Sequence, residues 1–291
     1  MGNTKSKKKF IICCLAPVLI LTIFFFAIPL VRGLALSFTN ATSTSIHGKF
    51  IGLENYIYMF TSDDFYQALF NTLKIIIIFP AIVNFMALIF AFFITQGKLR
   101  ESSFYRFLFF FPNIIAATAV GVLWSNIYSP TMGLFKKFFE TIGMESVANT
   151  PILGKSQTVL IAIIIVMIWQ TAGYYIVMYI AAIDGIDESV YEAATIDGCG
   201  VTRKIINITM PLLKDMIGIT FVLSISGAIG MSYIITAIMT SGGPSGSSTV
   251  LLYYMYQQAF ELSNFGYAMS IAVFTMFMSF ILSLISRRLS R

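Results

Sequence analysis

Long runs of apolar residues recur along this chain, and shorter segments between them carry most of its charges, glycines and prolines. A bilayer core about 30 Å thick requires roughly 20 apolar residues in a helix that crosses it. The pattern predicts six such helices, at residues 10–31, 69–95, 104–127, 158–182, 216–239 and 267–286. A transmembrane β-barrel would instead show short strands of alternating apolar and polar residues. Because these runs are continuous, we expect an all-α membrane protein.

Composition supports a lipid environment for the chain. Hydrophobic residues make up 57% of its 291 residues and charged residues 11%, against roughly 45–50% and about 25% in soluble domains. A soluble fold of this size could not cover so much apolar surface, because its outer layer would have to be polar. We therefore expect a single transmembrane domain over residues 1–291.

The placement of lysine and arginine predicts how the helices are oriented. Cytoplasmic loops of membrane proteins are enriched in these residues. With a cytoplasmic N-terminus, most of the 19 basic residues fall on the inner side. They are Lys5, Lys7, Lys8, Lys9, Lys98, Arg100, Arg106, Arg203, Lys204, Lys214, Arg287, Arg288 and Arg291. The pattern thus predicts that both termini are cytoplasmic, and it attributes the net charge of +6 to orientation in the membrane and not to nucleic-acid binding.

Few residues in the chain could support catalysis. The one histidine, His47, is too little for a histidine-based zinc site and falls in a predicted outer loop. Gly154-Lys155-Ser156 resembles the end of a phosphate-binding loop, but Asn149 occupies the position of its first glycine. The predicted spans hold no acidic residue at their centres, where proton- or ion-coupled carriers commonly keep one. We expect a protein that is not an enzyme, binds no cofactor or metal itself, and receives its energy through a cytoplasmic loop.

The loop between the fourth and fifth predicted helices has the pattern of two short helices joined by a bend. Asp187 can cap the first helix by accepting a backbone hydrogen bond. Ala193 and Ala194 favour a helix and allow close packing against a partner. Gly198 can take the left-handed conformation that ends a helix, and Pro211 suits the first turn of the fifth span. The simpler alternative is a surface hairpin that only links two spans.

This loop, at about residues 183–215, resembles the EAA loop of permease subunits in bacterial ABC importers. The matching residues are Glu192-Ala193-Ala194, Gly198, Ile208 and Pro211. The longer run Tyr191-Glu192-Ala193-Ala194-x-Ile196-Asp197-Gly198 resembles the carbohydrate-uptake branch, which includes the maltose and glycerol-3-phosphate permeases. Asp187 and Cys199 depart from the family, which usually has proline and alanine at these positions.

Two further segments are similar to that branch. Asn71-Thr72-Leu73 opens the second predicted span as it does in related permeases. The outer segment Thr240-Ser241-Gly242-Gly243-Pro244, followed by Thr249 and Tyr256, resembles the first of two paired permease subunits. The glycine-lysine tail usual in the second subunit is missing from this sequence.

The resemblance implies a six-helix permease subunit in the bacterial cell membrane, belonging to a binding-protein-dependent ABC importer for a sugar or oligosaccharide. Its implied partners are a second permease subunit, two ATP-binding subunits that hold ATP and magnesium, and an extracellular sugar-binding protein. Seven residues would couple the permease to the ATPase: Tyr191, Glu192, Ala193, Ala194, Asp197, Gly198 and Pro211. Glu192 would face a basic partner, while Ala193 and Ala194 would pack in a cleft of the ATPase.

A substrate pathway is expected in the spans that flank this loop, because transporter sites generally lie near the bilayer midplane. Gln170 and Tyr174 are four residues apart and share a helical face. Ser224 and Gly227 lie in the fifth span, and Asn113 lies in the third. Amide and hydroxyl groups can bind sugar hydroxyls, and an aromatic ring can lie against a sugar's apolar face. The alternative is that these polar groups join neighbouring helices through hydrogen bonds.

Two other functions fit a six-span chain less well. An ATP-independent channel or facilitator would leave the loop around Glu192 without a purpose. A membrane enzyme acting on lipid would lack catalytic groups.

Overall fold

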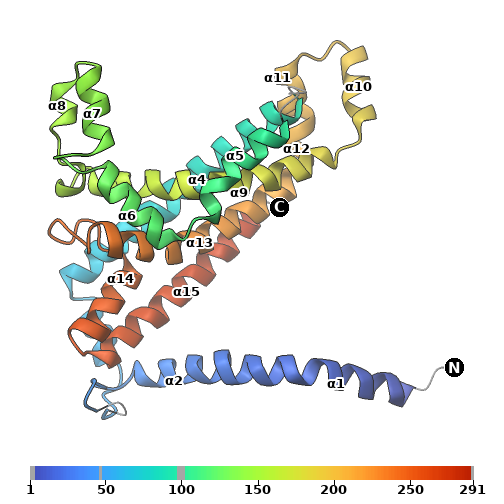
Figure 1. Cartoon of the computed structure of the whole chain (residues 1–291). Coiled ribbons are helices and arrows are strands. Elements are labelled where there is room, and N and C mark those ends of the chain that lie inside the picture. The colour runs from blue at the N-terminus through green and yellow to red at the C-terminus, as the bar shows by residue number, and fades with distance from the viewer. Residues whose placement is uncertain (1–3, 46–47, 97–101, 290–291) are drawn as a thin grey trace. The chain divides into compact units, whose positions relative to one another are not determined.

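The structure is a computed structural model that describes residues 4–45, 48–96 and 102–289 (Figure 1). Every regular element within these ranges is a helix, and one isolated β-bridge joins Thr39 to Phe50. The predicted helical class is therefore confirmed. His47, Lys98, Arg100 and Arg291, to which the sequence assigned a side of the membrane, lie outside the described residues.

Within the described part of the chain, five helices are long and apolar enough to cross a membrane. They are Ile11–Leu36, Asp63–Thr95, Val159–Asp184, Lys214–Met239 and Phe265–Ser286. The first comprises most of α1 (Thr4–Thr22), the π-helix η1 (Ile23–Ala27) and α2 (Ile28–Leu36). The others lie in α4 (Asp63–Gln96), α9 (Val159–Asp184), α13 (Lys214–Met239) and α15 (Phe265–Leu289). Five of the six predicted apolar helices are thus confirmed, with shifts of a few residues at their ends.

The third predicted span is not one continuous helix. It consists of α5 (Ser102–Ile114) and α6 (Ala117–Ile127), which are bent by 95° relative to each other. Pro112 has no backbone amide proton and so removes one intrahelical hydrogen bond near the end of α5. Ala116 then takes an extended backbone, with φ −56° and ψ 134°, which cannot continue a helix. The expectation of a single helix over 104–127 was wrong for this reason.

Shorter elements connect these helices. Before α4 lies α3 (Glu54–Met59), and between α6 and α9 lie α7 (Leu134–Thr141), α8 (Glu145–Ala148) and the 3₁₀ helix η2 (Ile152–Gly154). Between α9 and α13 lie α10 (Glu188–Ile196), α11 (Val201–Lys204), the π-helix η3 (Ile205–Thr209) and α12 (Met210–Leu212). Between α13 and α15 lie α14 (Leu251–Tyr256) and the π-helix η4 (Gln257–Glu261).

The chain divides into two compact units, one of residues 1–62 with 255–275 and the other of residues 63–254 with 276–291. In the first unit, the buried Asn55 side chain donates hydrogen bonds to the carbonyls of Ser37 and Thr39 at 2.8 and 2.9 Å. The amide of Gly266 also donates to the Ala41 carbonyl at 3.0 Å. These bonds hold the segment after α2 against α3 and the start of α15.

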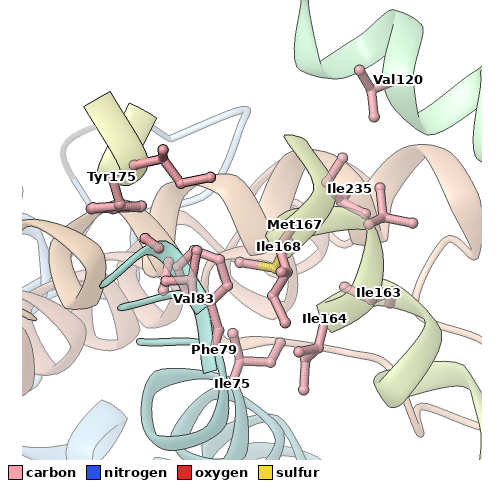
Figure 2. Close-up of a cluster of buried hydrophobic side chains, with 14 of the residues drawn as sticks. Ile75, Phe79, Val83, Val120, Ile163, Ile164, Met167, Ile168, Tyr175 and Ile235 are labelled. Atoms are coloured by element: carbon pink, nitrogen blue, oxygen red, sulfur yellow. The ribbon is translucent and has the colours of Figure 1, made fainter. Parts of the chain in front are cut away.

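The second unit has an apolar core formed mainly by α4, α9 and α13. Figure 2 shows Phe79 and Val83 of α4 close to Met167 of α9, and all three are fully buried. On another side of α9, Gly173 allows α5 to approach closely, because a Cβ at this position would overlap the carbonyl of Phe109. Small residues commonly permit such close helix packing in membranes. Both candidate regions from the sequence, the 183–215 loop and the spans beside it, belong to this unit.

Candidate functional site

The first helix of the 183–215 loop, α10, is capped at its start by Asp187. Its carboxylate accepts a hydrogen bond from the Ser189 amide at 2.9 Å. Hydrogen bonds from the side chain and backbone of Ser189 hold the pKa of the Asp187 carboxyl below its ordinary value. A negative charge at this position also favours the helix, because the exposed amides at its N-terminus carry partial positive charge. The predicted cap is confirmed.

The end of α10 is set by Gly198. This residue has φ +74°, in the left-handed region that residues with a Cβ rarely adopt. Around it, the Gly198 amide donates to the Thr195 carbonyl at 3.0 Å and the Cys199 amide donates to the Ala194 carbonyl at 2.9 Å. This satisfies carbonyls that the end of a helix leaves free, as expected for a glycine after the last turn. The predicted left-handed bend at Gly198 is confirmed.

After this bend the chain returns through α11, η3 and α12. Pro211 lies in the first turn of α12, whereas α13 begins at Lys214. The proline therefore opens a short helix immediately before the fifth span, three residues earlier than the start of α13. The second arm of the loop is also longer than the single short helix that the sequence suggested.

Two hydrogen bonds join α10 to this returning arm. The hydroxyls of Tyr191 and Thr209 are 2.9 Å apart, and both side chains are buried. Lys204 Nζ donates to the Thr195 hydroxyl at 2.6 Å. The two arms of the loop thus form one braced hairpin.

The outward face of α10 carries an acid, a small residue and a large apolar residue. Glu192 and Ala193 are exposed, and Ile196 is 87% exposed. Ala194, in contrast, is buried inside the hairpin together with Tyr191. Sequence reasoning did not select Ile196, although its spacing of four residues from Glu192 places both on one helical face.

The base of the loop is tied to α5 by an ion pair. Arg106 Nη2 lies 3.0 Å from Asp184 Oδ2, at the last residue of α9. Both side chains are partly exposed, so the pair adds little to stability. It connects α5 to the last residue of α9, where the loop begins. A polar cavity of about 450 Å³ lies beside it, lined by residues that include Thr95, Glu188 and Lys204.

The five predicted pathway residues do not gather at one place. Gln170 is 5% exposed, and its Nε2 donates to the Ile115 carbonyl at 2.9 Å, at the break between α5 and α6. Its Oε1 is buried without a partner among the described residues, so it can still accept a hydrogen bond. Ser224 is fully buried and accepts a hydrogen bond from Asn84 Nδ2 at 3.0 Å.

The other three residues are more accessible. Tyr174 is 38% exposed on α9, Gly227 is exposed on α13, and Asn113 is partly exposed near the end of α5. A role in binding substrate stays a prediction for all five. In this arrangement, Tyr174 and Gly227 have the open surroundings that such a role requires.

A buried polar cluster that sequence reasoning missed joins three spans. The Tyr179 hydroxyl of α9 lies 3.0 Å from Asn84 Oδ1 of α4 and 2.6 Å from the Thr220 hydroxyl of α13. Asn84 also donates to Ser224, which completes the cluster. All four side chains are at most 2% exposed. The available signal was Asn84 itself, since a polar residue inside a long apolar run usually has a partner.

The two segments that resembled carbohydrate-uptake permeases outside the 183–215 loop are in direct contact. Asn71 Nδ2 donates to the Thr249 carbonyl at 3.0 Å. The Leu251 amide donates to the Thr72 hydroxyl at 2.9 Å. The start of α4 is therefore bonded to the segment between α13 and α14, in which Gly242 adopts φ +80°.

Similarity to known proteins extends over nearly the whole chain. The probable ABC transporter permease protein YurN of Bacillus subtilis is 34% identical over 275 residues, covering 94% of this chain and 93% of the relative. The diacetylchitobiose uptake system permease protein NgcF of Streptomyces coelicolor is 30% identical over 278 residues, covering 93% and 79%.

A crystal structure of a bacterial ABC transporter involved in import of the acidic polysaccharide alginate shares the fold. It matches with a TM-score of 0.86 at 21% identity, covering 98% of this chain and 96% of the other. Residues 59–291 match the family model of the binding-protein-dependent transport system inner membrane component. The resemblance to ABC importer permeases is thus confirmed, and the chain belongs to the family of inner membrane components of binding-protein-dependent transport systems.

Proposed function

We propose that this chain is the first of two paired permease subunits of an ABC importer that moves a sugar or oligosaccharide into a bacterial cell. Family membership supports the permease role. The names of two relatives support the substrate class, since one serves diacetylchitobiose uptake and another, MsmF of Streptococcus mutans, belongs to a multiple sugar-binding transport system. Its partners are a second permease, two ATPase subunits that hold ATP and magnesium, and an extracellular binding protein.

The observation that carries this proposal is the braced hairpin at 183–215. Figure 1 shows α10 past the end of α9, and the returning arm leads into α13. The face of α10 with Glu192, Ala193 and Ile196 is available to a partner. Burial of Ile196 and Ala193 against a partner would remove apolar surface from water and so favour binding. Because the hairpin continues directly into two spans, a displacement of α10 by an ATPase subunit would move α9 and α13.

The topology of the proposal counts the bent pair α5–α6 as one span. The chain then crosses the membrane six times as a single permease domain, with both termini and α10 in the cytoplasm. Arg106, Arg203 and Lys204 fall on the cytoplasmic side in this orientation, as the positive-inside rule requires.

The substrate pathway in this proposal runs along the middle of α9 and α13. Tyr174 and Gly227 face it directly, and Gln170, Ser224 and Asn113 contribute when the helices change their relative positions. The chain binds no cofactor itself. Solute would pass near the bilayer midplane, where transporter sites generally lie.

Co-purification with an ATPase tests the function. The full chain, isolated from its native membrane in mild detergent, should bring two copies of an ATP-hydrolysing subunit, and Ile196→Asp should release them. A purified chain that transports sugar at full rate without any ATPase would instead establish the channel or facilitator alternative.

Cysteine labelling tests the orientation. With Cys13, Cys14 and Cys199 replaced by serine, a membrane-impermeant thiol reagent should label a cysteine introduced at Ser245 in intact cells. It should spare a cysteine introduced at Arg288 until the membrane is opened. Labelling of both in intact cells would contradict the six-span topology.

A further inference from the structure

Tyr175 of α9 carries a buried ring and an unpaired hydroxyl. The residue is 5% exposed and belongs to the apolar core of its unit (Figure 2). Its hydroxyl makes no hydrogen bond to any residue that the structure describes. Tyr179, one turn further along the same helix, differs because its hydroxyl bonds both Asn84 and Thr220.

The Tyr175 hydroxyl is directed toward Gly227 of α13. It lies 4.0 Å from the position that a Cβ on Gly227 would take, and it is the one described atom within 4 Å of that position. Gly227 itself is exposed. The space that a side chain at Gly227 would occupy is therefore open, with the Tyr175 hydroxyl at its edge.

Both residues lie well inside their helices, far from either end. Tyr175 is in the middle third of α9 (Val159–Asp184), and Gly227 is near the centre of α13 (Lys214–Met239). If these helices span the membrane, the hydroxyl is at a depth where lipid offers no hydrogen-bond acceptor. Unsatisfied polar groups at that depth are costly, so polar surfaces there usually face a water-filled cavity or a partner.

The surroundings of Tyr175 and Gly227 include two further exposed groups. Tyr174 is exposed, and its ring contacts the ring of Tyr175 with centroids 5.2 Å apart. Beside Gly227, the small polar residue Ser226 is also exposed.

We propose that the Tyr175 hydroxyl hydrogen-bonds a hydroxyl group of the transported sugar when the sugar lies against Gly227. This inference rests on the proposed function and adds a residue to its pathway. Gly227 provides the room, the neighbouring ring of Tyr174 provides an apolar surface, and Tyr175 provides the polar contact. Tyr175 thus determines specificity for a hydroxyl-bearing solute.

Tyr175→Phe tests the proposal because it removes the hydroxyl and keeps the ring in the core. The assay is uptake by proteoliposomes that contain the assembled complex and its binding protein. The probe is whichever of radiolabelled diacetylchitobiose, maltose and an alginate oligosaccharide the wild-type complex imports. The variant leaves a sugar hydroxyl without its partner in a confined site, which should raise the KM for that sugar about five- to a hundredfold, with the amount of permease per vesicle unchanged.

Gly227→Ser provides a second, independent variant. The introduced serine hydroxyl would hydrogen-bond the Tyr175 hydroxyl in place of the sugar, so KM should rise as in Tyr175→Phe. The KM of the double variant should be no higher than that of either single variant. Gly230→Ser is the matched control. An added Cβ at Gly230 meets no described atom within 4 Å, so KM should stay at the wild-type value.

Three results would overturn the proposal. An unchanged KM in Tyr175→Phe would exclude the contact. If Tyr175→Phe lowers the amount of permease in the membrane but the remaining protein has the wild-type KM, Tyr175 has a structural role only. Import of none of the three sugars by the wild-type complex would remove the proposed substrate class and this inference with it. Sugar import by Tyr175→Phe with the wild-type KM would remove this inference alone and leave the proposed function intact.

Discussion

The hydroxyl of Tyr191 on α10 lies 2.9 Å from the hydroxyl of Thr209 on the returning arm of the 183–215 loop. Both side chains are buried, so water does not compete for this bond. Since α10 follows α9 and the returning arm leads into α13, the bond fixes the exposed face of α10 relative to two spans.

Tyr191→Phe should loosen this hairpin without unfolding the permease. A net hydrogen bond contributes about 0.5–1.5 kcal/mol, which corresponds to about two- to tenfold faster amide hydrogen exchange in α10 if exchange occurs through local opening. Exchange in α9 and α13 should stay as in the wild type. Equal exchange in α10 of variant and wild type would show that the bond does not brace the loop.

The bend after α10 gives a matched pair of glycine substitutions. A Cβ at Gly198 or at Gly200 would meet no described atom within 4 Å, so neither alanine would clash. Gly198 has φ +74°, where an alanine costs about 1–2 kcal/mol. We expect Gly198→Ala to reduce sugar-stimulated ATP hydrolysis severalfold in the assembled complex and Gly200→Ala to leave it near the wild-type rate. Equal rates in the two variants would contradict a bend that requires glycine at position 198.

The polar cluster around Asn84 should stabilise the packing of three helices. Tyr179→Phe removes two hydrogen bonds and leaves Asn84 and Thr220 buried with fewer partners. Interhelical hydrogen bonds in membranes contribute about 0.6 kcal/mol on average, so the midpoint of thermal unfolding of the purified complex should fall by a few degrees. Tyr175→Phe is the comparison, since its hydroxyl has no partner to lose. A midpoint lowered equally in both variants would rule out a specific role for the cluster.

Much of this fold could be predicted from two kinds of sequence pattern: long apolar runs, and residues that cap or end a helix. Apolar runs identify membrane helices because lipid imposes both length and polarity. The cap at Asp187 and the bend at Gly198 depend on a few neighbouring residues and were predicted correctly. The break at Ile115 is different, since its carbonyl is satisfied by Gln170, 55 residues away. The sequence showed Pro112 but not the distant partner that stabilises a 95° bend.

The pathway was harder to predict for a related reason. Helical periodicity shows which residues share a face but not which neighbour that face meets. Gln170 and Tyr174 are four residues apart, yet one is bonded at the α5–α6 break and the other is exposed. Ser224 has the chemistry of a sugar-binding residue but bonds Asn84 of another helix. Tyr175 became visible only through the open space beside Gly227.

The central claim is that α10 transmits ATP hydrolysis in a partner subunit to sugar movement through this chain. The measurement that tests it most directly is binding-protein-stimulated ATP hydrolysis together with sugar uptake, in proteoliposomes of the assembled complex carrying Glu192→Lys. Glu145→Lys on α8 is the control, because Glu145 is also exposed but lies in the segment between α6 and α9. We predict that Glu192→Lys inserts normally but that its ATP hydrolysis and sugar uptake both fall at least about tenfold. A tenfold fall corresponds to the loss of about 1.4 kcal/mol of coupling free energy. Glu145→Lys should retain both activities. Full stimulation and full uptake in Glu192→Lys would contradict the account.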